Sequence, residues 1–329
     1  MRPLSVVDRE RFCFIERRDL MLETPMDIVK LFPVRKNKQQ KQAFRDAAES
    51  YARSCGYECR IEEGRSGCRN VVIGDPETAK FLLTAHYDTP ASIGIPNIIT
   101  PCNPVAFILY QIFVVGLFFL AAFLVGLPVM LLTANEKITF LAAYAAYFGL
   151  LFTMMFGPAN KSNVNDNTSG VVTVLEMMRT LPEIHRSKVC FVLFDLEEAG
   201  LIGSASYRKA HKKATENQIV LNLDCVGEGD EIVLFPMKKL AKDREKMLEL
   251  CKCVGRFGSK TITVKHKGFR YYPSDQKNFP YGVGIAAFRR NKFLGLYCDK
   301  IHTRKDTVLD ESNVNILRAA LTTYITGEA

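Results

Sequence analysis

The sequence predicts an α/β fold, in which a mostly parallel mixed sheet carries helices on both faces and is interrupted by a two-helix transmembrane hairpin. Three observations favour this fold. Short apolar runs alternate with amphipathic stretches, polar motifs follow directly after several of the apolar runs, and two long apolar runs stand near the middle. A chain of 329 residues is long enough to bury a full α/β core.

The apolar runs and amphipathic stretches give the expected elements in order. Strands are expected at residues 57–62, 70–73, 81–85, 189–194, 219–223, 262–264, 284–288 and 294–297. Helices are expected at residues 38–55, 170–181, 203–212, 239–254 and 311–325. Because strands that alternate with helices pair in parallel through helical crossovers, this order favours a sheet with helices on both faces.

The middle of the chain is almost free of charge. Between residues 88 and 161 the only charged residues are Glu136 and Lys137, which separate two apolar runs, 105–132 and 138–156. As helices these runs reach about 42 Å and about 28 Å, against a hydrocarbon core of about 30 Å. A buried helix pair or a soluble dimerisation lid would need a polar face at helical spacing, and neither run has one.

These lengths predict a multi-pass membrane protein with two spans, in contact with the lipid bilayer through residues 105–156. The chain then divides into a globular part at 1–103, the hairpin at 104–157, and the remainder of the globular domain at 158–329. Pro128 is expected to end or kink the first helix. The hairpin tip holds one Lys while all other Lys and Arg residues lie in the flanks, which favours a cytoplasmic globular domain.

The composition narrows the classes of function. The net charge of +9 is dispersed, and short basic clusters such as the one from Arg35 to Lys38 are typical of solvated helix faces. No nucleic-acid-binding module with aromatic residues among the basic ones is present, so we expect no nucleic-acid partner and a basic surface that faces anionic lipid. Residues 1–18 carry too many charges for a signal peptide. Ten cysteines at irregular spacing predict reduced thiols rather than disulfides or a structural zinc site. None of these features sets an oligomeric state.

Polar motifs follow the third, fourth and fifth predicted strands, where open α/β sheets place their sites. His86 and Asp88 follow the third, Glu197 and Glu198 the fourth, and Asp224 the fifth. Asp88 is placed to orient the ring of His86, as metal-bound imidazoles require. Adjacent glutamates point in different directions in a turn, so one can bind metal while the other meets a water. Taken singly, each motif is also typical of a capped strand end or a solvated pair.

Two further groups complete the pattern. Asp166 stands in a polar turn at a predicted helix N-terminus, where it can bridge two cations. His302 stands near the end of the chain, with Asp306 nearby. The Asp166 turn alone is an ordinary helix cap. Imidazole and carboxylate groups in five places, next to strand ends or turns, together predict a metal site. Without a thiolate this donor set suits zinc, manganese or cobalt.

The same motifs resemble peptidase family M28, which contains co-catalytic zinc peptidases. The similar stretches are residues 81–90, 163–181, 189–207, 219–227 and 301–310. Family M20 shares the order of ligands, but it inserts a lid domain before the last one. Here 78 positions separate Asp224 from His302, which leaves no room for that lid. The resemblance covers most of residues 70–325 apart from the hairpin.

The resemblance implies two Zn²⁺ ions per chain and a role for each residue. His86 and Asp224 would hold one ion, Glu198 and His302 the other, Asp166 would bridge both, and Glu197 would be the catalytic base with Asp88 in support. The chain departs from the family pattern in two places. Gln276 stands where the family has a histidine, and the hairpin lies between the first two ligands, where the family has a short loop.

The resemblance implies a di-zinc exopeptidase, and the predicted hairpin would anchor it to a membrane. An aminopeptidase acting on short peptides is favoured because acidic groups can hold an α-ammonium. Glu197 would take a proton from water and pass it to the leaving amine. A carboxypeptidase, an N-acyl amino acid deacylase, a glutaminyl cyclase and an inactive membrane scaffold remain as alternatives. Cyclases related to the family use one zinc, so the presence of both His86 and Asp166 argues against that reading. Inactive relatives typically lose ligands, and this sequence has all five.

Overall fold

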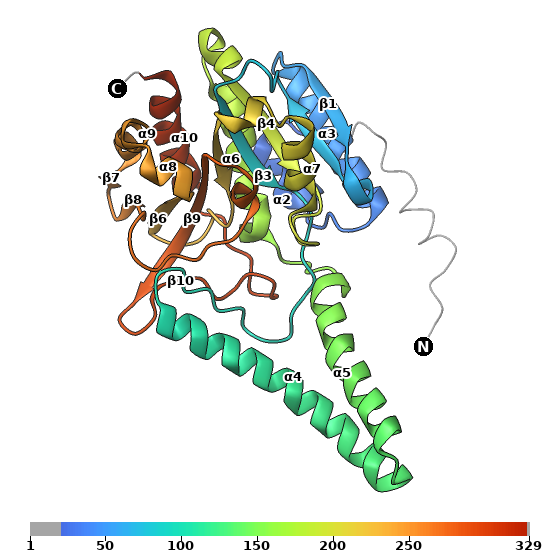
Figure 1. Cartoon of the computed structure of the whole chain (residues 1–329). Coiled ribbons are helices and arrows are strands. Elements are labelled where there is room, and N and C mark those ends of the chain that lie inside the picture. The colour runs from blue at the N-terminus through green and yellow to red at the C-terminus, as the bar shows by residue number, and fades with distance from the viewer. Residues whose placement is uncertain (1–20, 328–329) are drawn as a thin grey trace.

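The computed structural model describes residues 21–327, so the charged segment at 1–18 lies outside the described residues. The described chain forms a ten-stranded mixed sheet with helices on both faces, and a long helical hairpin projects from one end of it (Figure 1). This arrangement confirms the α/β fold class predicted from the sequence.

The sheet is parallel at its centre and mixed toward its edges. Its order is β1-β2-β4-β3-β5-β9-β6-β8-β7, and β10 pairs with β9. The bounds are β1 Cys59–Glu63, β2 Arg69–Ile73, β3 Phe81–His86, β4 Val189–Phe194, β5 Ile219–Leu223, β6 Glu231–Pro236, β7 Gly255–Phe257, β8 Lys260–Val264, β9 Gly282–Asn291 and β10 Gly295–Tyr297. The strands β4, β3, β5 and β9 pair in parallel, so their carboxyl ends lie along one edge.

Two of these strands are absent from the sequence prediction. β6 pairs in parallel with β8 and antiparallel with β9, and β7 forms an antiparallel edge on β8. The signal for β6 is present, because Glu231–Pro236 contains four consecutive buried apolar residues bounded by turn residues. β7 is three residues long and mostly exposed, so it leaves no apolar pattern to read.

Helices cover both faces because successive residues of the central strands point to opposite sides. On β3, Leu83 belongs to the larger core, which α3, α6 and α10 cover, while Leu82 belongs to a smaller core beneath Tyr207 of α7. The bounds are α2 Ile28–Leu31, α3 Lys38–Ser54, α6 Gly170–Thr180, α7 Ile202–Ala210, α8 Lys238–Lys242, α9 Arg244–Leu250 and α10 Glu311–Thr326.

The single helix expected at residues 239–254 is wrong. The chain forms α8, then α9, then a short 3₁₀ turn at Cys251–Cys253. Asp243 separates the two helices, because its backbone is extended and its side chain accepts a hydrogen bond from the N–H of Lys246 (3.2 Å). An aspartate that caps the next helix in this way competes with helix continuation.

The hairpin consists of α4 (Pro104–Thr133) and α5 (Glu136–Phe156). Asn103 caps α4 by accepting from the N–H of Ala106, and Asn135 caps α5 by accepting from the N–H groups of Lys137 and Ile138. Pro128 lies inside α4 and does not end it. The two helices meet at the tip and spread apart toward the sheet (Figure 1).

The side chains of the hairpin are mostly apolar and mostly exposed. Leu131, Leu132 and Leu141, for example, are 77%, 85% and 70% exposed. Within the described residues, α4 and α5 are long and apolar enough to cross a membrane, a statement that rests on length and composition alone. Exposed apolar surface of this extent is unusual on a soluble monomer and marks a contact surface for lipid or for another apolar partner.

Candidate functional site

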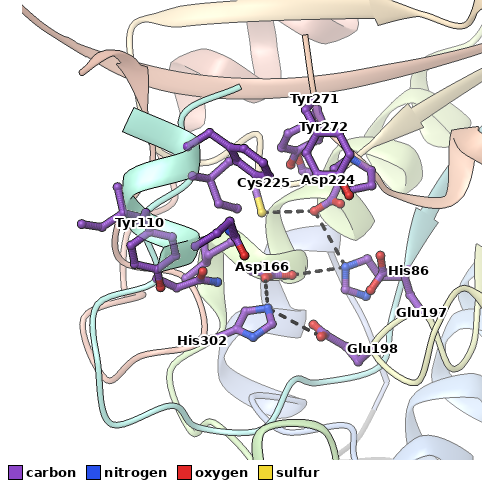
Figure 2. A pocket seen from close by; sticks show the side chains of 17 residues that line it. His86, Tyr110, Asp166, Glu197, Glu198, Asp224, Cys225, Tyr271, Tyr272 and His302 are labelled. Carbon is purple, nitrogen blue, oxygen red and sulfur yellow. Dashed lines mark hydrogen bonds and ion pairs between the residues drawn. The ribbon is translucent and has the colours of Figure 1, made fainter. Parts of the chain in front are cut away.

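The polar motifs after β3, β4 and β5 meet at the carboxyl ends of the central parallel strands. His86 is the last residue of β3 and lies level with Phe194, the last residue of β4, while Asp224 follows directly after β5. Glu197 and Glu198 stand in the turn after β4. Because the three strands are neighbours, their ends bring side chains from distant parts of the sequence together (Figure 2).

Two polar groups reach this edge from outside the strands. Asp166 lies in the turn before α6, and His302 lies in the loop after β10. The Asp166 carboxylate extends one oxygen toward each histidine. Its Oδ1 is 3.2 Å from Nε2 of His86, and its Oδ2 is 3.0 Å from Nε2 of His302. Figure 2 shows the carboxylate between the two rings, a position suited to bridging two cations.

Within the described part of the chain, three groups of potential ligand atoms lie close enough together to hold a cation, and two of these groups share Asp166. One group contains His86 and Asp224, and the other contains Glu198 and His302. In the first group, Nε2 of His86 is 3.8 Å from Oδ1 of Asp224, and in the second, Nε2 of His302 is 3.5 Å from Oε2 of Glu198. Glu197 also lies close to His86 and Glu198.

The donor set and its spacing fit zinc. Zinc bonds to nitrogen and oxygen are about 2.0–2.2 Å long, which places the ligand atoms of a tetrahedral site about 3.3–3.6 Å apart. The four atom pairs given above are separated by 3.0 to 3.8 Å. In addition, Oε1 of Glu198 is buried and has no hydrogen-bond partner among the described residues, as suits an oxygen that binds a cation.

Asp88 connects two of the motifs. Its Oδ1 lies 3.5 Å from Nδ1 of His86, on the side of the ring opposite Asp166. The same carboxylate accepts hydrogen bonds from the backbone N–H groups of Glu197 (3.0 Å) and Glu198 (3.2 Å). Asp88 therefore holds the Glu-Glu turn by two hydrogen bonds and lies beside the ring of His86, where the His-x-Asp spacing predicts an orienting carboxylate.

Asp306 and Arg35 form hydrogen bonds with the segments that hold the predicted ligands. The Asp306 carboxylate accepts from the backbone N–H groups of Asn165 (2.6 Å) and Asp166 (3.0 Å). The fully buried Arg35 donates to the carbonyls of Phe32 (2.6 Å) and Tyr87 (2.5 Å) and to Oγ1 of Thr168 (3.0 Å). It thus ties together the segments that follow His86 and Asp166. Sequence reasoning notes Asp306 only as a neighbour of His302 and reads Arg35 as a solvated charge.

Arg35 was misread because it stands in a short basic cluster that resembles an exposed helix face. Nothing in the local sequence separates it from its exposed neighbours, since its burial depends on the segments folded around it. Burial lowers the pKa of Arg35 to about 10, and the carboxylates of Asp88 and Asp166 oppose that shift. The guanidinium therefore stays charged at neutral pH and offsets part of the negative charge at the site.

The electrostatics of the site are dominated by crowded, buried carboxylates. Burial raises the pKa of Glu197 well above its ordinary value, and the charges of Glu198 and Asp224 act in the same direction. Burial also raises the pKa of Glu198, with the charge of Asp166 adding to the effect. For Asp166, hydrogen bonds from His302 and His86 outweigh burial and hold the pKa well below its usual range. Positive charge is the natural complement of this cluster.

Asp224 has two contacts that sequence reasoning missed. The thiol of Cys225 donates to its Oδ1 (3.1 Å), and the hydroxyl of Tyr272 donates to its backbone oxygen (3.0 Å). Burial raises the pKa of the Cys225 thiol well above its ordinary value, so it remains a neutral donor beside the carboxylate.

Gln276, at the position where a histidine was expected, lies behind the site. Its Oε1 accepts from Nδ2 of Asn222 on β5 (3.1 Å), and its Nε2 donates to the carbonyl of Tyr272 (2.7 Å). The amide therefore holds the Tyr271–Tyr272 segment against the sheet. Its effect on the site is indirect, through the position of that segment.

A cavity of about 290 Å³ opens over the ligand groups. Its floor contains the predicted ligands and Glu197, and its walls are mostly apolar and aromatic. The walls come from the segment 97–99, the start of α4, the Tyr271–Pro273 segment and Ile301. Among the described residues, no Lys or Arg lines this cavity. A charged floor beneath apolar walls suits a ligand with one cationic end and one apolar side chain.

Comparisons with known proteins point to the same class of fold. The model of peptidase family M28 matches residues 153–324, more than half of the chain. Asp166, Glu197, Glu198, Asp224 and His302 lie within this match, whereas the predicted ligand His86 lies on the other side of the hairpin.

One curated relative and two solved structures illustrate the similarity. Aminopeptidase YwaD of Bacillus subtilis is 39% identical over 66 residues, a stretch that covers 19% of this chain and 14% of that protein. The LapA aminopeptidase of Legionella pneumophila superposes with a TM-score of 0.54 and 12% identity, covering 99% of this chain and 76% of that one. The glutaminyl cyclase of Macrostomum lignano gives a TM-score of 0.54 and 10% identity, covering 98% and 92%. At these identities the solved structures establish the shared fold.

Proposed function

Because the chain belongs to peptidase family M28, we propose that it is a membrane-anchored di-zinc aminopeptidase that removes N-terminal residues from short peptides. The observation that carries this proposal is the pair of ligand groups joined by Asp166. One group holds His86 and Asp224 and the other holds Glu198 and His302, which are the sets that the family resemblance implies for two zinc ions.

Each residue of the site has a defined part in the proposed reaction. Zinc bound there would supply Lewis acidity, lowering the pKa of a water molecule and polarising the scissile carbonyl. Glu197 lies at the edge of the ligand groups without being required by either, and it takes the proton of the attacking water. Glu197 then delivers that proton to the leaving amine, while Asp88 keeps the Glu197 turn and the His86 ring in register.

The shape and charge of the cavity support the removal of N-terminal residues. The N-terminus of a peptide fits at the polar floor, and an apolar side chain fits against the walls. A carboxypeptidase needs a cation to hold the substrate's terminal carboxylate, and among the described residues no Lys or Arg lines the cavity. This absence favours an aminopeptidase over a carboxypeptidase.

The proposed anchoring in the membrane rests on α4 and α5. Both are long enough to cross a hydrocarbon core of about 30 Å, and most of their apolar side chains are exposed. The start of α4 and the end of α5 both join the sheet domain, and the tip of the hairpin points away from it (Figure 1). The two proposed spans therefore keep the catalytic domain on one side of the bilayer. The excess of basic residues in the flanks favours the cytoplasmic side.

Activity of the purified, detergent-solubilised protein tests this proposal. We expect hydrolysis of leucyl-p-nitroanilide and of leucyl peptides, and no hydrolysis of acetyl-leucyl-p-nitroanilide, because acetylation removes the α-ammonium. Removal of metal with a chelator should abolish the activity, and added Zn²⁺ should restore it. Hydrolysis of N-acetyl-leucine with no action on leucyl substrates would show a deacylase instead, and release of C-terminal residues would show a carboxypeptidase.

A further inference from the structure

The two helices of the hairpin differ in length. α4 has 30 residues and α5 has 21, which correspond to about 45 Å and about 32 Å. Only about 30 Å is needed to cross the hydrocarbon core, so α5 matches a bilayer while α4 has a surplus of about two and a half turns. Because the helices meet at the tip, the surplus lies at the start of α4, beside the sheet domain (Figure 1).

The start of α4 is attached to the sheet domain by specific contacts. The amide of Asn103 donates to the carbonyls of Phe293 (3.1 Å) and Leu294 (3.3 Å) in the β9–β10 turn. The hydroxyl of Tyr110 donates to the carbonyl of Pro96 (2.9 Å). These bonds hold the first two turns of α4 in a fixed place relative to the sheet.

Aromatic packing strengthens this attachment on a second side. The ring of Phe107 lies 5.1 Å from the ring of Tyr271 and 5.9 Å from that of Phe269, measured between centroids. Tyr271 precedes Tyr272, whose hydroxyl contacts the backbone of Asp224. The aromatic contact thus joins the membrane helix to the segment beside a proposed metal ligand.

One face of these turns is turned toward the metal centre. Phe107, Tyr110 and Gln111 line the cavity above the ligand groups. Their spacing of three and four residues places them on a single helix face. Figure 2 shows Tyr110 on the opposite side of the cavity from His86. The cavity is therefore closed on one side by the hairpin and on the other by the sheet.

Further along α4, the same face packs against α5 instead of lining the cavity. Phe118, which continues the stripe by about two turns, is buried and packs against Tyr147 of α5. Gln111 is the one side-chain amide of α4, and it lines the cavity although it is also exposed. A polar side chain at this position suits a helix face that meets water in the cavity and packs against apolar side chains further along.

We propose that the first two turns of α4 form the specificity wall of the enzyme, with Phe107 and Tyr110 contacting the substrate's N-terminal side chain. This inference rests on the proposed aminopeptidase function. The substrate's N-terminus lies at the polar floor, and its side chain extends across the cavity to the aromatic wall. The substrates are therefore peptides with a large apolar N-terminal residue, and a membrane helix sets that preference.

Kinetics of wall variants test the proposal in the full-length, detergent-solubilised protein. Phe107→Ala and Tyr110→Ala remove the aromatic contacts, so the ratio of kcat/KM for leucyl over alanyl-p-nitroanilide should fall about tenfold or more, within the range that lost pocket contacts produce. Tyr110→Phe keeps the ring and should retain the ratio. Ile108→Ala is the matched control, since Ile108 stands on the same turn, is 54% exposed and does not line the cavity.

The proposal is wrong if the leucyl-to-alanyl ratio of kcat/KM changes by less than about twofold in both alanine variants while their zinc content and thermal stability stay at the wild-type level. A variant that fails to fold is replaced by Phe107→Leu, which keeps an apolar side chain and should shift the ratio in the same direction by a smaller factor.

A binding measurement separates this proposal from the proposed function. The chain has no tryptophan, so Phe107→Trp introduces a single fluorescent reporter on the wall, and Ile108→Trp introduces one on the lipid-facing side. Leucine hydroxamate added to the zinc-loaded protein should shift the emission of the first variant and leave the second unchanged. If the protein hydrolyses no aminoacyl substrate but the shift occurs, the aminopeptidase proposal fails and the wall remains. If the hydroxamate is bound in equilibrium dialysis without an emission shift at position 107, the wall proposal fails.

Discussion

At the carboxyl edge of the sheet, charged side chains are buried, whereas along the α4–α5 hairpin apolar side chains are exposed. His86 and Asp166 are 1% and 3% exposed, while Leu132 is 85% exposed. Buried charge and exposed apolar surface are both costly in water unless something else is bound. Each region therefore implies a partner. The crowded carboxylates fit cations, and the hairpin fits lipid, which is the partner that we propose for it.

The two regions meet at a single cavity. Its floor is the charged edge of the sheet, and one of its walls is the start of α4. In our proposal the floor carries out the hydrolysis and the wall selects the substrate. Both regions are therefore parts of the site. Variants that separate the two contributions are the most informative.

Removing the hairpin should have the largest effect, because it should convert a membrane-bound protein into a soluble one. Replacement of residues 104–156 by a flexible Gly/Ser linker should make the protein soluble without detergent, and it should leave metal binding intact because loop closure costs little. A second variant that keeps 104–112 and replaces 113–156 should also be soluble. Only the second variant should keep the preference for leucyl over alanyl substrates.

Partition between detergent-free buffer and liposomes measures the first outcome, and the ratio of kcat/KM measures the second. If both shortened proteins still sediment with lipid, the hairpin is not the anchor. If both keep the wild-type ratio, α4 has no part in selectivity.

Glu197→Gln should have the next largest effect, confined to the charged region. The amide cannot accept the water's proton, so kcat should fall by about 10²–10⁴-fold while both metals stay bound. Glu216→Gln is the control and should leave kcat unchanged, because Glu216 pairs with Arg208 and Lys239 and does not line the cavity. A Glu197→Gln enzyme that keeps more than about a tenth of the wild-type kcat would remove Glu197 from the role of base.

Arg35→Met should destabilise the fold by about 3–5 kcal/mol, because it leaves buried hydrogen-bond acceptors and carboxylates without their cation. The exposed Arg53, paired with Glu49 on α3, gives the comparison, and Arg53→Met should cost less than about 1 kcal/mol. Chemical denaturation of both variants, in the same detergent, measures the difference. Equal costs would show that the charge of Arg35 is not needed at the site.

The smallest expected effect is a pH dependence away from both regions. His211 lies between Glu77 (2.7 Å) and Glu62 (2.9 Å). Burial lowers the pKa of His211, but these two carboxylates outweigh it and the net pKa is raised above 6.5. A raised folded-state pKa gives stability that is fully present below the unfolded value of about 6.5 and is lost as the pH rises through the folded value.

His211→Gln should therefore reduce the free energy of unfolding by about 0.5–1 kcal/mol at pH 6, a small value because Glu77 is largely exposed. The loss should shrink at pH 9, where the wild-type imidazole is neutral. Denaturation curves at the two pH values provide the test, and a loss that grows with pH would contradict the assigned sign.

How far the sequence predicts the molecule depends on where the information lies. β4 and β5 were predicted with the correct bounds because uninterrupted apolar runs of that length, bounded by polar residues, are strong signals. The hairpin was visible for the same reason. The break at Asp243 was missed because the helical pattern continues on both sides of a residue that also caps helices well.

The residues around the site were predicted less completely than the candidate ligands. His86, Asp166, Glu198, Asp224 and His302 stand in short polar motifs after apolar runs, and the structure brings all of them together. Arg35 and Tyr110 have no such marks. Their positions depend on which segments fold against the ligand loops and on where α4 meets the sheet domain, and a local pattern contains neither fact.

The content of zinc in the purified protein tests the central claim most directly. Elemental analysis of the wild type and of Glu197→Gln should give two zinc ions per chain. Asp166→Ala should give fewer than one, because a bridging ligand serves both ions. One ion or none in the wild type, or two in Asp166→Ala, would contradict the two-metal site built around Asp166.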